Sequence, residues 1–157
     1  SLASSFGSEV TYEGEFRSKF DAEVGGRTFE VRSQHLNKWG WCLVTETALA
    51  GVSALHAAEI RPRFLGGFNV DQGAAEFGKR FSVRDLGFPL RDGWLNERLK
   101  KTILQFYALG LSRDPLVIEE GRLVFRARVA LRRFESGPLI ELMKRQAAIA
   151  SALEGSL

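Results

Sequence analysis

The sequence predicts a single α+β domain: a mainly antiparallel sheet built from hairpins, with two principal helices packed on one of its faces. Two observations carry this prediction. Apolar and polar residues alternate along several stretches that meet at glycine-containing turns, as in β-hairpins. Two later stretches, 93–109 and 138–153, repeat apolar residues every three or four positions, as amphipathic helices do. The order of these elements does not call for the strand–helix–strand repeats of a parallel sheet.

The composition is that of an ordinary globular domain and excludes few partners. Among 157 residues, 45% are apolar and 26% charged, and the net charge is +3. That small excess does not require nucleic acid or an anionic membrane as partner. No stretch approaches the ~20 apolar residues that cross a bilayer. Because residues 1–9 include no initiator Met and no signal-peptide pattern, we expect a disordered or cloning-derived tail, a domain over 10–157, and a longer parent protein.

The first hairpin is predicted from a period of two between residues 10 and 24, with one apolar and one charged face. Gly25-Gly26 supplies the positive φ angles of a two-residue loop. Counting away from that loop brings the apolar sides of both strands together. The predicted partners are Val24 with Arg27, Ala22 with Phe29, Phe20 with Val31, Asp21 with Glu30 and Lys19 with Arg32.

The middle of the chain gives a third strand and one ambiguous segment. Aromatic and β-branched residues predict a strand over 39–47. In ALAGVSALHAAEIRPR (48–63) the alanines favour a short helix, whereas 60–64 fits an extended segment that Pro62 confines to an edge or a strand end. The stretch FLGGFNVDQGAAEFGKRFSVR (64–84) lacks the G-K-[ST] of a phosphate-binding loop, so we interpret it as turns followed by a strand.

The second half predicts a helix, a hairpin and a helix. The helix at 93–109 has Asp92 as a fitting N-cap and Gly110 as its stop. Glu120-Gly121 then forms the turn between strands 116–119 and 122–131. Gly137-Pro138 opens the last helix, and the tail EGSL is expected to fray. The expected buried stripe of the last helix contains Leu139, Leu142, Met143, Gln146, Ile149 or Ala150, and Leu153.

No constellation of residues predicts catalysis, and we expect no catalytic residue, cofactor or metal. Cys42 is the single cysteine and is interpreted as a small buried residue. His35 falls in a polar connector. His56 and Glu59 would lie one turn apart on a helix and offer at most half a metal site. The carboxylate pairs at 21/23 and 119/120 lack the burial that raises a pKa for acid catalysis.

Arginine is the strongest feature outside the expected core. Arg126, Arg128 and Arg132 share one parity along a strand, and Arg80 and Arg84 have the same parity as each other along FGKRFSVRDL. Adjacent strands would give a basic face suited to nucleic-acid backbone or acidic headgroups. The alternative is a set of solvated sheet positions that protect edges from aggregation. The candidate anion-binding residues are Arg80, Arg84, Arg126, Arg128 and Arg132.

The elements together resemble the soluble domains of poorly characterised bacterial membrane-associated proteins, including the DUF3137 family. The resemblance lies in the hairpin FRSKFDAEVGGRTFEVRSQ (16–34) and in four later segments. It implies membrane attachment outside this piece, a location in the cytoplasm or at the cytoplasmic face of a bacterial membrane, and no established activity. The later segments are AAEFGKRFSVRDL (74–86), WLNERLKKTILQF (94–106), PLVIEEGRLVFRAR (115–128) and PLIELMKRQAAIASAL (138–153).

Three functional hypotheses follow. The first is a non-enzymatic domain that binds a partner protein or a second copy of itself. The second is anion or nucleic-acid binding through the arginine face. The third is a hydrolase centred on His56 and Glu59. We favour the first, because nearly all apolar side chains are assigned to a core and no polar cluster remains for chemistry.

Overall fold

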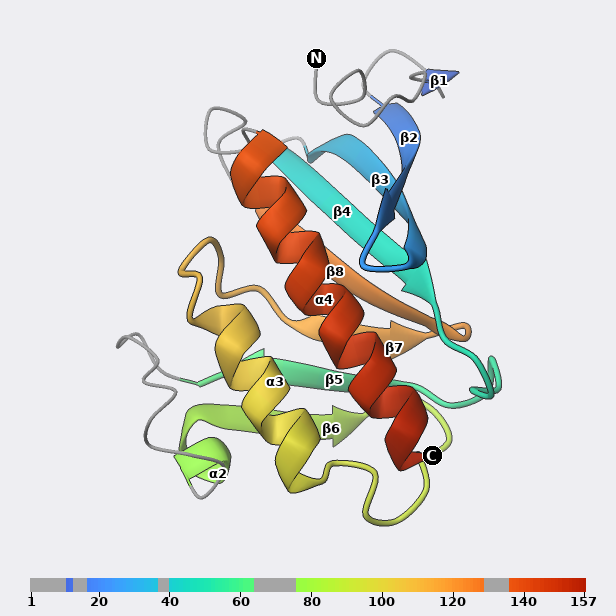
Figure 1. Ribbon diagram of the computed structural model, residues 1–157, viewed down its shortest axis with the longest axis vertical. Helices are drawn as coiled ribbons and strands as arrows, with labels where there is room; N and C mark the ends of the chain where they lie inside the picture. Colours follow the sequence, from blue (N-terminus) through green and yellow to red (C-terminus); the bar gives the residue numbers. More distant parts are fainter. Residues whose placement is uncertain (1–10, 13–16, 37–39, 64–75, 129–135) are drawn as a thin grey trace.

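The computed structural model describes residues 11–12, 17–36, 40–63, 76–128 and 136–157 (Figure 1). Within them an eight-stranded sheet has the order β1-β2-β3-β4-β8-β7-β5-β6, and all neighbouring strands are antiparallel. The strands are β1 (Thr11–Tyr12), β2 (Arg17–Val24), β3 (Arg27–Leu36), β4 (Gly40–Ala48), β5 (Ala58–Pro62), β6 (Phe81–Asp85), β7 (Leu116–Glu119) and β8 (Arg122–Arg128). The helices are α2 (Phe77–Arg80), α3 (Glu97–Tyr107) and α4 (Ser136–Ser156).

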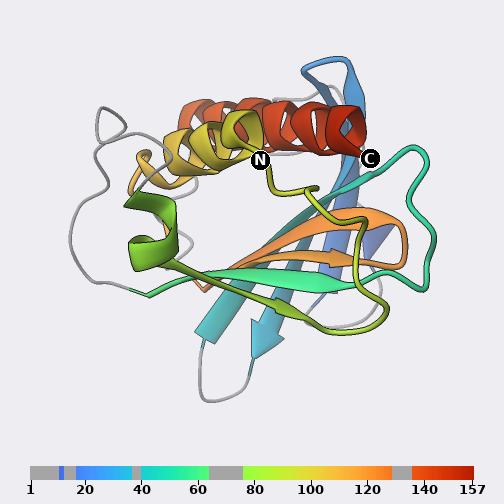
Figure 2. The ribbon, with the colours of Figure 1, turned by 90° about the horizontal axis from the view of Figure 1, so that it is seen from below.

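The two long helices lie side by side on one face of the sheet, as Figure 2 shows. We call this the inner face, and the opposite one, which no helix of the described residues covers, the outer face. The predicted α+β class with two principal helices on one face is therefore confirmed.

Both predicted hairpins are confirmed in their register. Val24 pairs with Arg27 and Phe20 with Val31 around the first turn, and Ile118 pairs with Leu123 around the second. Gly25 and Gly26 have φ angles of 60° and 75°, as the first turn requires. A Cβ on Gly25 would lie 2.9 Å from the Cβ of Ala147, so this turn approaches α4 as closely as the backbone permits.

The core lies between the inner face and the helices. Phe125 of β8 packs edge-on against Phe106, with ring centroids 4.9 Å apart. Phe81 contacts Tyr107 at 5.3 Å and stacks on Phe77 at 4.5 Å. The whole expected stripe of α4 is buried, including both alternatives at 149 and 150. Burial of apolar area at roughly 25 cal/mol per Å² makes this layer the main source of stability.

The segments between the strands correct several expectations. Residues 48–57 form no helix, and the extended alternative is confirmed as β5, in which Pro62 is the last residue. His35 lies in β3 rather than in a connector. Residues 77–80 are helical, because one helical turn lets Phe77 reach the core beside Phe81. Residues 64–75, the predicted turns, lie outside the described residues.

The ends of the long helices also differ from expectation. Asn96, not Asp92, caps α3, and its Oδ1 accepts a hydrogen bond from the backbone N of Leu99 (2.9 Å). At the other end of that helix Gly110 has a φ angle of 68° and fits the expected stop. The last turn of α4 is not frayed, because Glu154 accepts hydrogen bonds from the Ala50 backbone N (2.6 Å) and from the Arg27 guanidinium.

One polar side chain of α4 is fully buried against the sheet. Gln146 Nε2 donates to the carbonyl oxygens of Thr45 (3.0 Å) and Leu123 (3.2 Å), and its Oε1 accepts from the Thr45 hydroxyl (2.7 Å). The side chain of Gln146 therefore bonds to β4 and β8 together and fixes the helix over their junction. A buried amide with its partners satisfied specifies one arrangement of the helix on the sheet.

Replacing Gln146 and Thr45 singly and together should measure the energy of the hydrogen bond between their side chains. We expect Gln146→Met to lower the free energy of unfolding by about 1–3 kcal/mol, because the buried Thr45 hydroxyl loses its acceptor. The double variant with Thr45→Val should lose less than the two single variants summed, since both polar partners are then removed. Urea denaturation of the four proteins measures the coupling; additive losses would contradict it.

Candidate functional site

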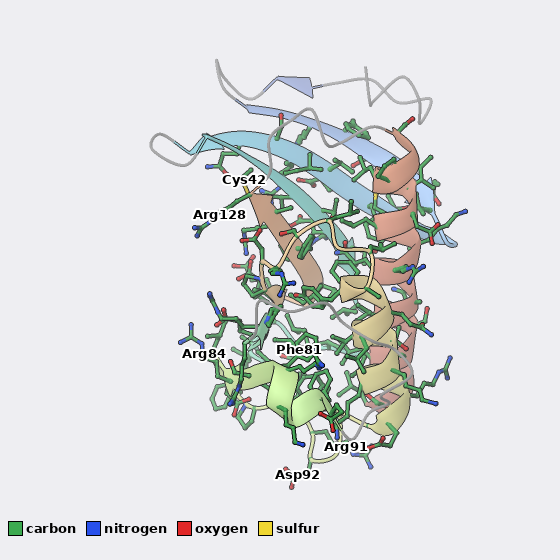
Figure 3. The ribbon with its side chains drawn as sticks, turned by 90° about the vertical axis from the view of Figure 1, so that its left-hand side faces the viewer. Cys42, Phe81, Arg84, Arg91, Asp92 and Arg128 are labelled. Atoms are coloured by element: carbon green, nitrogen blue, oxygen red, sulfur yellow. The ribbon has the colours of Figure 1, made fainter. Side chains whose placement is uncertain are left out.

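The candidate arginines do not form one continuous patch. Arg84 lies on β6 and Arg126 and Arg128 on β8, and two strands, β7 and β5, separate β6 from β8. All three point from the outer face, and Figure 3 shows Arg84 and Arg128 directed away from the helices and well apart. Arg80 belongs to the helical turn α2, so it does not share a strand face with Arg84. Arg132 lies outside the described residues.

Each described strand arginine of this set has a carboxylate partner. Arg84 Nε lies 2.5 Å from Glu59 Oε2, and Arg126 Nη2 lies 2.5 Å from Glu119 Oε1. Arg128 Nε lies 4.0 Å from Asp114. These ion pairs neutralise much of the charge that an anion would need, so the geometry does not favour the arginine face as an anion site.

The ion pairs continue across the central strands of the outer face. Glu46 of β4 lies between Arg32 of β3, at 3.0 Å, and Arg122 of β8, at 3.1 Å. Arg32 also approaches Glu30 at 3.3 Å. Arg32, which the first hairpin places opposite Lys19, is thus balanced by Glu30 of its own strand and by Glu46 of the next.

Glu59 is the most buried carboxylate of these ion pairs. The residue is 4% exposed and accepts hydrogen bonds from Arg84 and from Arg61, whose Nη2 lies 2.6 Å away. Burial alone would raise its pKa, but the hydrogen bonds and charges of the two arginines outweigh burial and hold the pKa below the ordinary 4.5. Both carboxylate oxygens of Glu59 accept hydrogen bonds from these arginines, so we assign Glu59 a structural role rather than a catalytic one.

The histidine and cysteine candidates do not converge. His56 Nδ1 donates to the carbonyl oxygen of Pro89 (2.8 Å), and β5 starts at Ala58, so His56 and Glu59 do not lie one helical turn apart. Cys42 is 4% exposed on the outer face beside Val44 and Val124, which confirms the prediction that it is buried. Among the described residues, no group of three or more His, Cys, Asp or Glu side chains could hold a metal ion.

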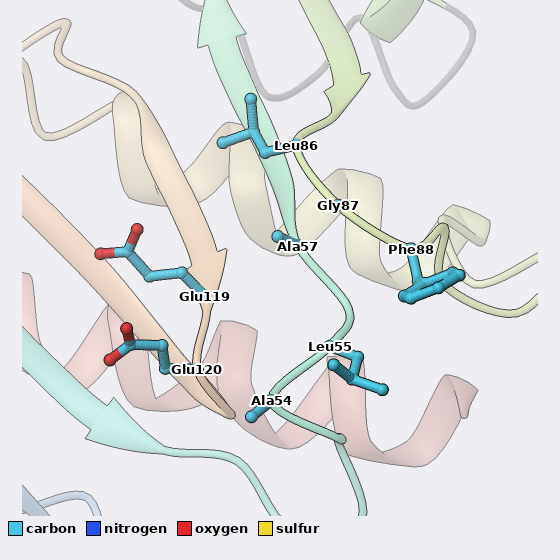
Figure 4. A pocket seen from close by; sticks show the side chains of 8 residues that line it. All are labelled: Ala54, Leu55, Ala57, Leu86, Gly87, Phe88, Glu119 and Glu120. Atoms are coloured by element: carbon cyan, nitrogen blue, oxygen red, sulfur yellow. The ribbon is translucent and has the colours of Figure 1, made fainter.

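A pocket of ≈ 520 Å³ opens at one end of the outer face (Figure 4). We call it the outer pocket. Figure 4 shows the long helices behind the strands, and the pocket lies where the segment before β5, the segment after β6 and the β7–β8 turn meet. Its lining residues are Ala54, Leu55, Ala57, Leu86, Gly87, Phe88, Glu119 and Glu120.

Large apolar side chains at the pocket are unusually exposed, since most others among the described residues are buried or half-buried. Leu55 is 64%, Leu86 46% and Phe88 62% exposed. Single exposed apolar residues are normal on protein surfaces, but a cluster around a hollow is the mark of an interaction site. The outer pocket is therefore the candidate functional site.

Backbone hydrogen bonds hold the two apolar segments together. Leu86 N donates to Ala57 O (2.9 Å), and Phe88 N donates to Leu55 O (3.0 Å). Between these bonds, a Cβ on Gly87 would lie 2.9 Å from Leu55 O, so only glycine permits the approach. The pocket is thus preformed by the backbone.

The acidic side of the pocket comes from the second hairpin turn. Glu119 ends β7 on the outer face and is paired with Arg126. Glu120 is exposed at the first turn position, with a φ angle of 53°, and in the described parts of the chain it is the one non-glycine residue with positive φ. Among those residues its carboxylate has no hydrogen-bond or ion-pair partner.

Reasoning from the sequence did not identify this pocket. The available signal was Leu86, which has the parity of Arg84 and is an apolar residue at a position that should face water. Leu55 gave no such signal, because the segment that contains it also fitted a helix. The meeting of three distant segments depends on strand order, which local patterns do not contain.

Neutralising Glu59 should make stability depend on pH in a defined direction. Because its pKa is lowered on folding, its contribution is present above pH 4.5 and is lost as the pH falls through the folded value. We expect Glu59→Gln to lower the free energy of unfolding by about 1–3 kcal/mol at neutral pH. The difference from wild type should shrink below pH 4.5. Denaturation across pH measures it. The exposed pair partner Glu141→Gln should cost only about 0.3–0.5 kcal/mol.

Cys42 should be unreactive in the folded protein. Burial raises the pKa of its thiol above the ordinary 9.0, and the charge of Asp114 adds to this. We expect a thiol reagent such as DTNB to label the native protein far more slowly than the urea-unfolded protein at mildly alkaline pH. Equal labelling rates in the two states would show that the outer face opens at this point.

Comparisons of the chain with family models, with curated proteins and with solved structures found no match. The resemblance drawn from the sequence segments therefore stays a prediction. None of the helices in the described segments is both long and apolar enough to span a bilayer.

Proposed function

We propose that this domain is a non-enzymatic protein-binding module and that the outer pocket is its binding site. The observation that carries the proposal is the cluster of Leu55, Leu86 and Phe88, which leaves large apolar surface in water around a preformed hollow. Covering that surface with a partner would release the cost of its hydration, at roughly 25 cal/mol per Å².

The chemistry of the lining supports binding rather than catalysis. The lining side chains are aliphatic or aromatic, apart from the carboxylates of Glu119 and Glu120 on one side. Glu119 is already paired with Arg126, and Glu120 is exposed on a turn. Such a set suits a partner's apolar side chain. It does not provide the acid and base, or the nucleophile and base, that a hydrolytic mechanism needs.

The resemblance to membrane-associated bacterial proteins adds a cellular setting to the proposal. In that setting the domain lies in the cytoplasm or at the cytoplasmic face of a membrane and recruits its partner there, while segments outside this piece supply the attachment. A reading frame that encodes apolar segments of ~20 residues beside this domain would support the setting. A frame that encodes only these residues would count against it.

Removing the apolar side chains should abolish partner binding while preserving the fold. We expect the double variant Leu86→Ser/Phe88→Ser to bind at least about tenfold more weakly, as truncation of central apolar anchors does. The partner is first captured from a lysate of the source cells with the wild-type domain, then purified, and its affinity is measured by calorimetry.

The matched control is Val83→Ser. Val83 is 39% exposed on β6 but does not line the pocket, so its loss removes apolar surface from the strand that precedes the pocket segment. This control should bind like the wild type. Equal affinity of all three proteins, with folding verified by circular dichroism, would refute the proposed function.

A further inference from the structure

We propose that the occupant of the outer pocket is a basic, apolar peptide segment of a partner protein: a large aliphatic or aromatic side chain flanked by Lys or Arg. This inference rests on the proposed function and deepens it by specifying the partner's chemistry. It follows from the shape of the pocket, from the position of its charges and from the backbone conformation of Glu120.

The shape of the pocket selects a bulky apolar side chain. Its small residues are Ala54, Ala57 and Gly87, and its large ones are Leu55, Leu86 and Phe88. Small residues beside large ones leave a hollow that a Leu, Met or Phe side chain can fill. The exposed ring of Phe88 also offers a face on which an arginine or lysine could rest.

The charges of the pocket select a basic neighbour for that side chain. The lining carries two carboxylates and no cationic residue. Glu119 is partly neutralised by Arg126, whereas Glu120 has no ion-pair partner among the described residues. The chain as a whole has a net charge of +3, so this acidic apolar spot differs from the average surface. Such local complementarity selects a partner and steers its approach.

The backbone at Glu120 supports a binding role for its carboxylate. The first position of this two-residue turn, with a φ angle of 53°, favours Gly, Asn or Asp. Glutamate there costs stability, and strained conformations of this kind cluster at functional sites. A side chain at a position that disfavours it, at the edge of a pocket and without a described partner, is one whose use lies in binding.

The same charges argue against a second copy of the chain as occupant. A symmetric dimer places the same patch of both subunits in contact. Centred on the outer pocket, it would bring Glu119 and Glu120 of both copies together, and close like charges oppose such an interface. A basic segment meets the same carboxylates with opposite charge.

Three short peptides, acetylated and amidated at their ends, test the inference with the wild-type domain. The first carries a Leu-Phe pair between two pairs of lysines, the second replaces the lysines by glutamates, and the third replaces Leu-Phe by alanines. Chemical-shift mapping locates the binding site, and fluorescence anisotropy at low and high salt gives the affinities. We expect the first peptide to shift the amide signals of Leu55, Leu86 and Phe88 and to bind about tenfold more tightly than either of the others.

Charge variants of the domain complete the test. Glu120→Gln should weaken the first peptide about two- to fivefold, mostly at low salt, as the loss of an exposed ion pair does. Glu97→Gln is the matched control, since it removes the same charge from an exposed site at the start of α3, and its affinity should not change. Glu120→Asn should raise Tm by about 2–4 °C, because asparagine suits the turn better, and should still weaken peptide binding. A residue with only a structural role would not raise stability and lower affinity when replaced.

The outcomes separate the inference from the proposed function. If the glutamate peptide shifts the same amides with equal affinity, the pocket binds peptides but the charge preference is wrong. If no peptide shifts them and sedimentation shows self-association that Leu86→Ser/Phe88→Ser abolishes, the occupant is a second copy. The inference then fails and the proposed function survives. If no peptide shifts them and the same double variant leaves partner capture unchanged, both fail.

Discussion

The packing of both long helices on the same face of the sheet is the constraint on which the rest of the described structure depends. Two long helices cover the inner face, so the inward strand residues enter a dry core. Many outward residues, such as Arg84 and Arg126, meet water, although Cys42, Val44 and Val124 form a small buried apolar cluster among them. The many charged residues of the outer face must then be balanced in sign. The chain meets this requirement with cross-strand ion pairs, of which the contacts of Glu46 with Arg32 and Arg122 are the central example. Individual surface pairs contribute little to stability, so their main effect is to balance the charge of this face.

Against this background the outer pocket is the exception to the rule. Leu86, the first residue after β6, continues the outward parity of Arg84 at a place that a charged residue would fill under the same constraint, and Ala57 beside it is too small to cover it. At one end of the outer face, charged residues thus give way to apolar residues that surround a hollow. Arg84 and Arg126, two of the arginines that the sequence singled out, are paired with carboxylates in the charged part of the face, so the geometry there does not favour an anion site.

Local chemistry made much of the fold predictable. Gly25-Gly26 and Glu120-Gly121 fixed two registers because a two-residue turn determines every pair that follows it. The stripe of α4 was readable for the same reason, since helical periodicity is a local property. The errors arose where tertiary contacts decide. Phe77 is buried in the core on the helical turn at 77–80, and Asn96 caps α3 although Asp92 is of an equally suitable residue type. The candidate site was missed because its three segments meet only through the pairing of β5 with β6 and β7.

The position of β8 has a consequence for the order in which the sheet is assembled during synthesis. Strands β2 to β4 form one meander and β5 pairs with β6, but β4 and β5 are joined through β8 and β7, which come later in the chain. Until residues 116–128 leave the ribosome, the nascent polypeptide holds two incomplete sheets whose facing edges have unsatisfied backbone groups. A chain that stalls or is truncated before β7 and β8 have joined β4 to β5 would therefore be most exposed to aggregation.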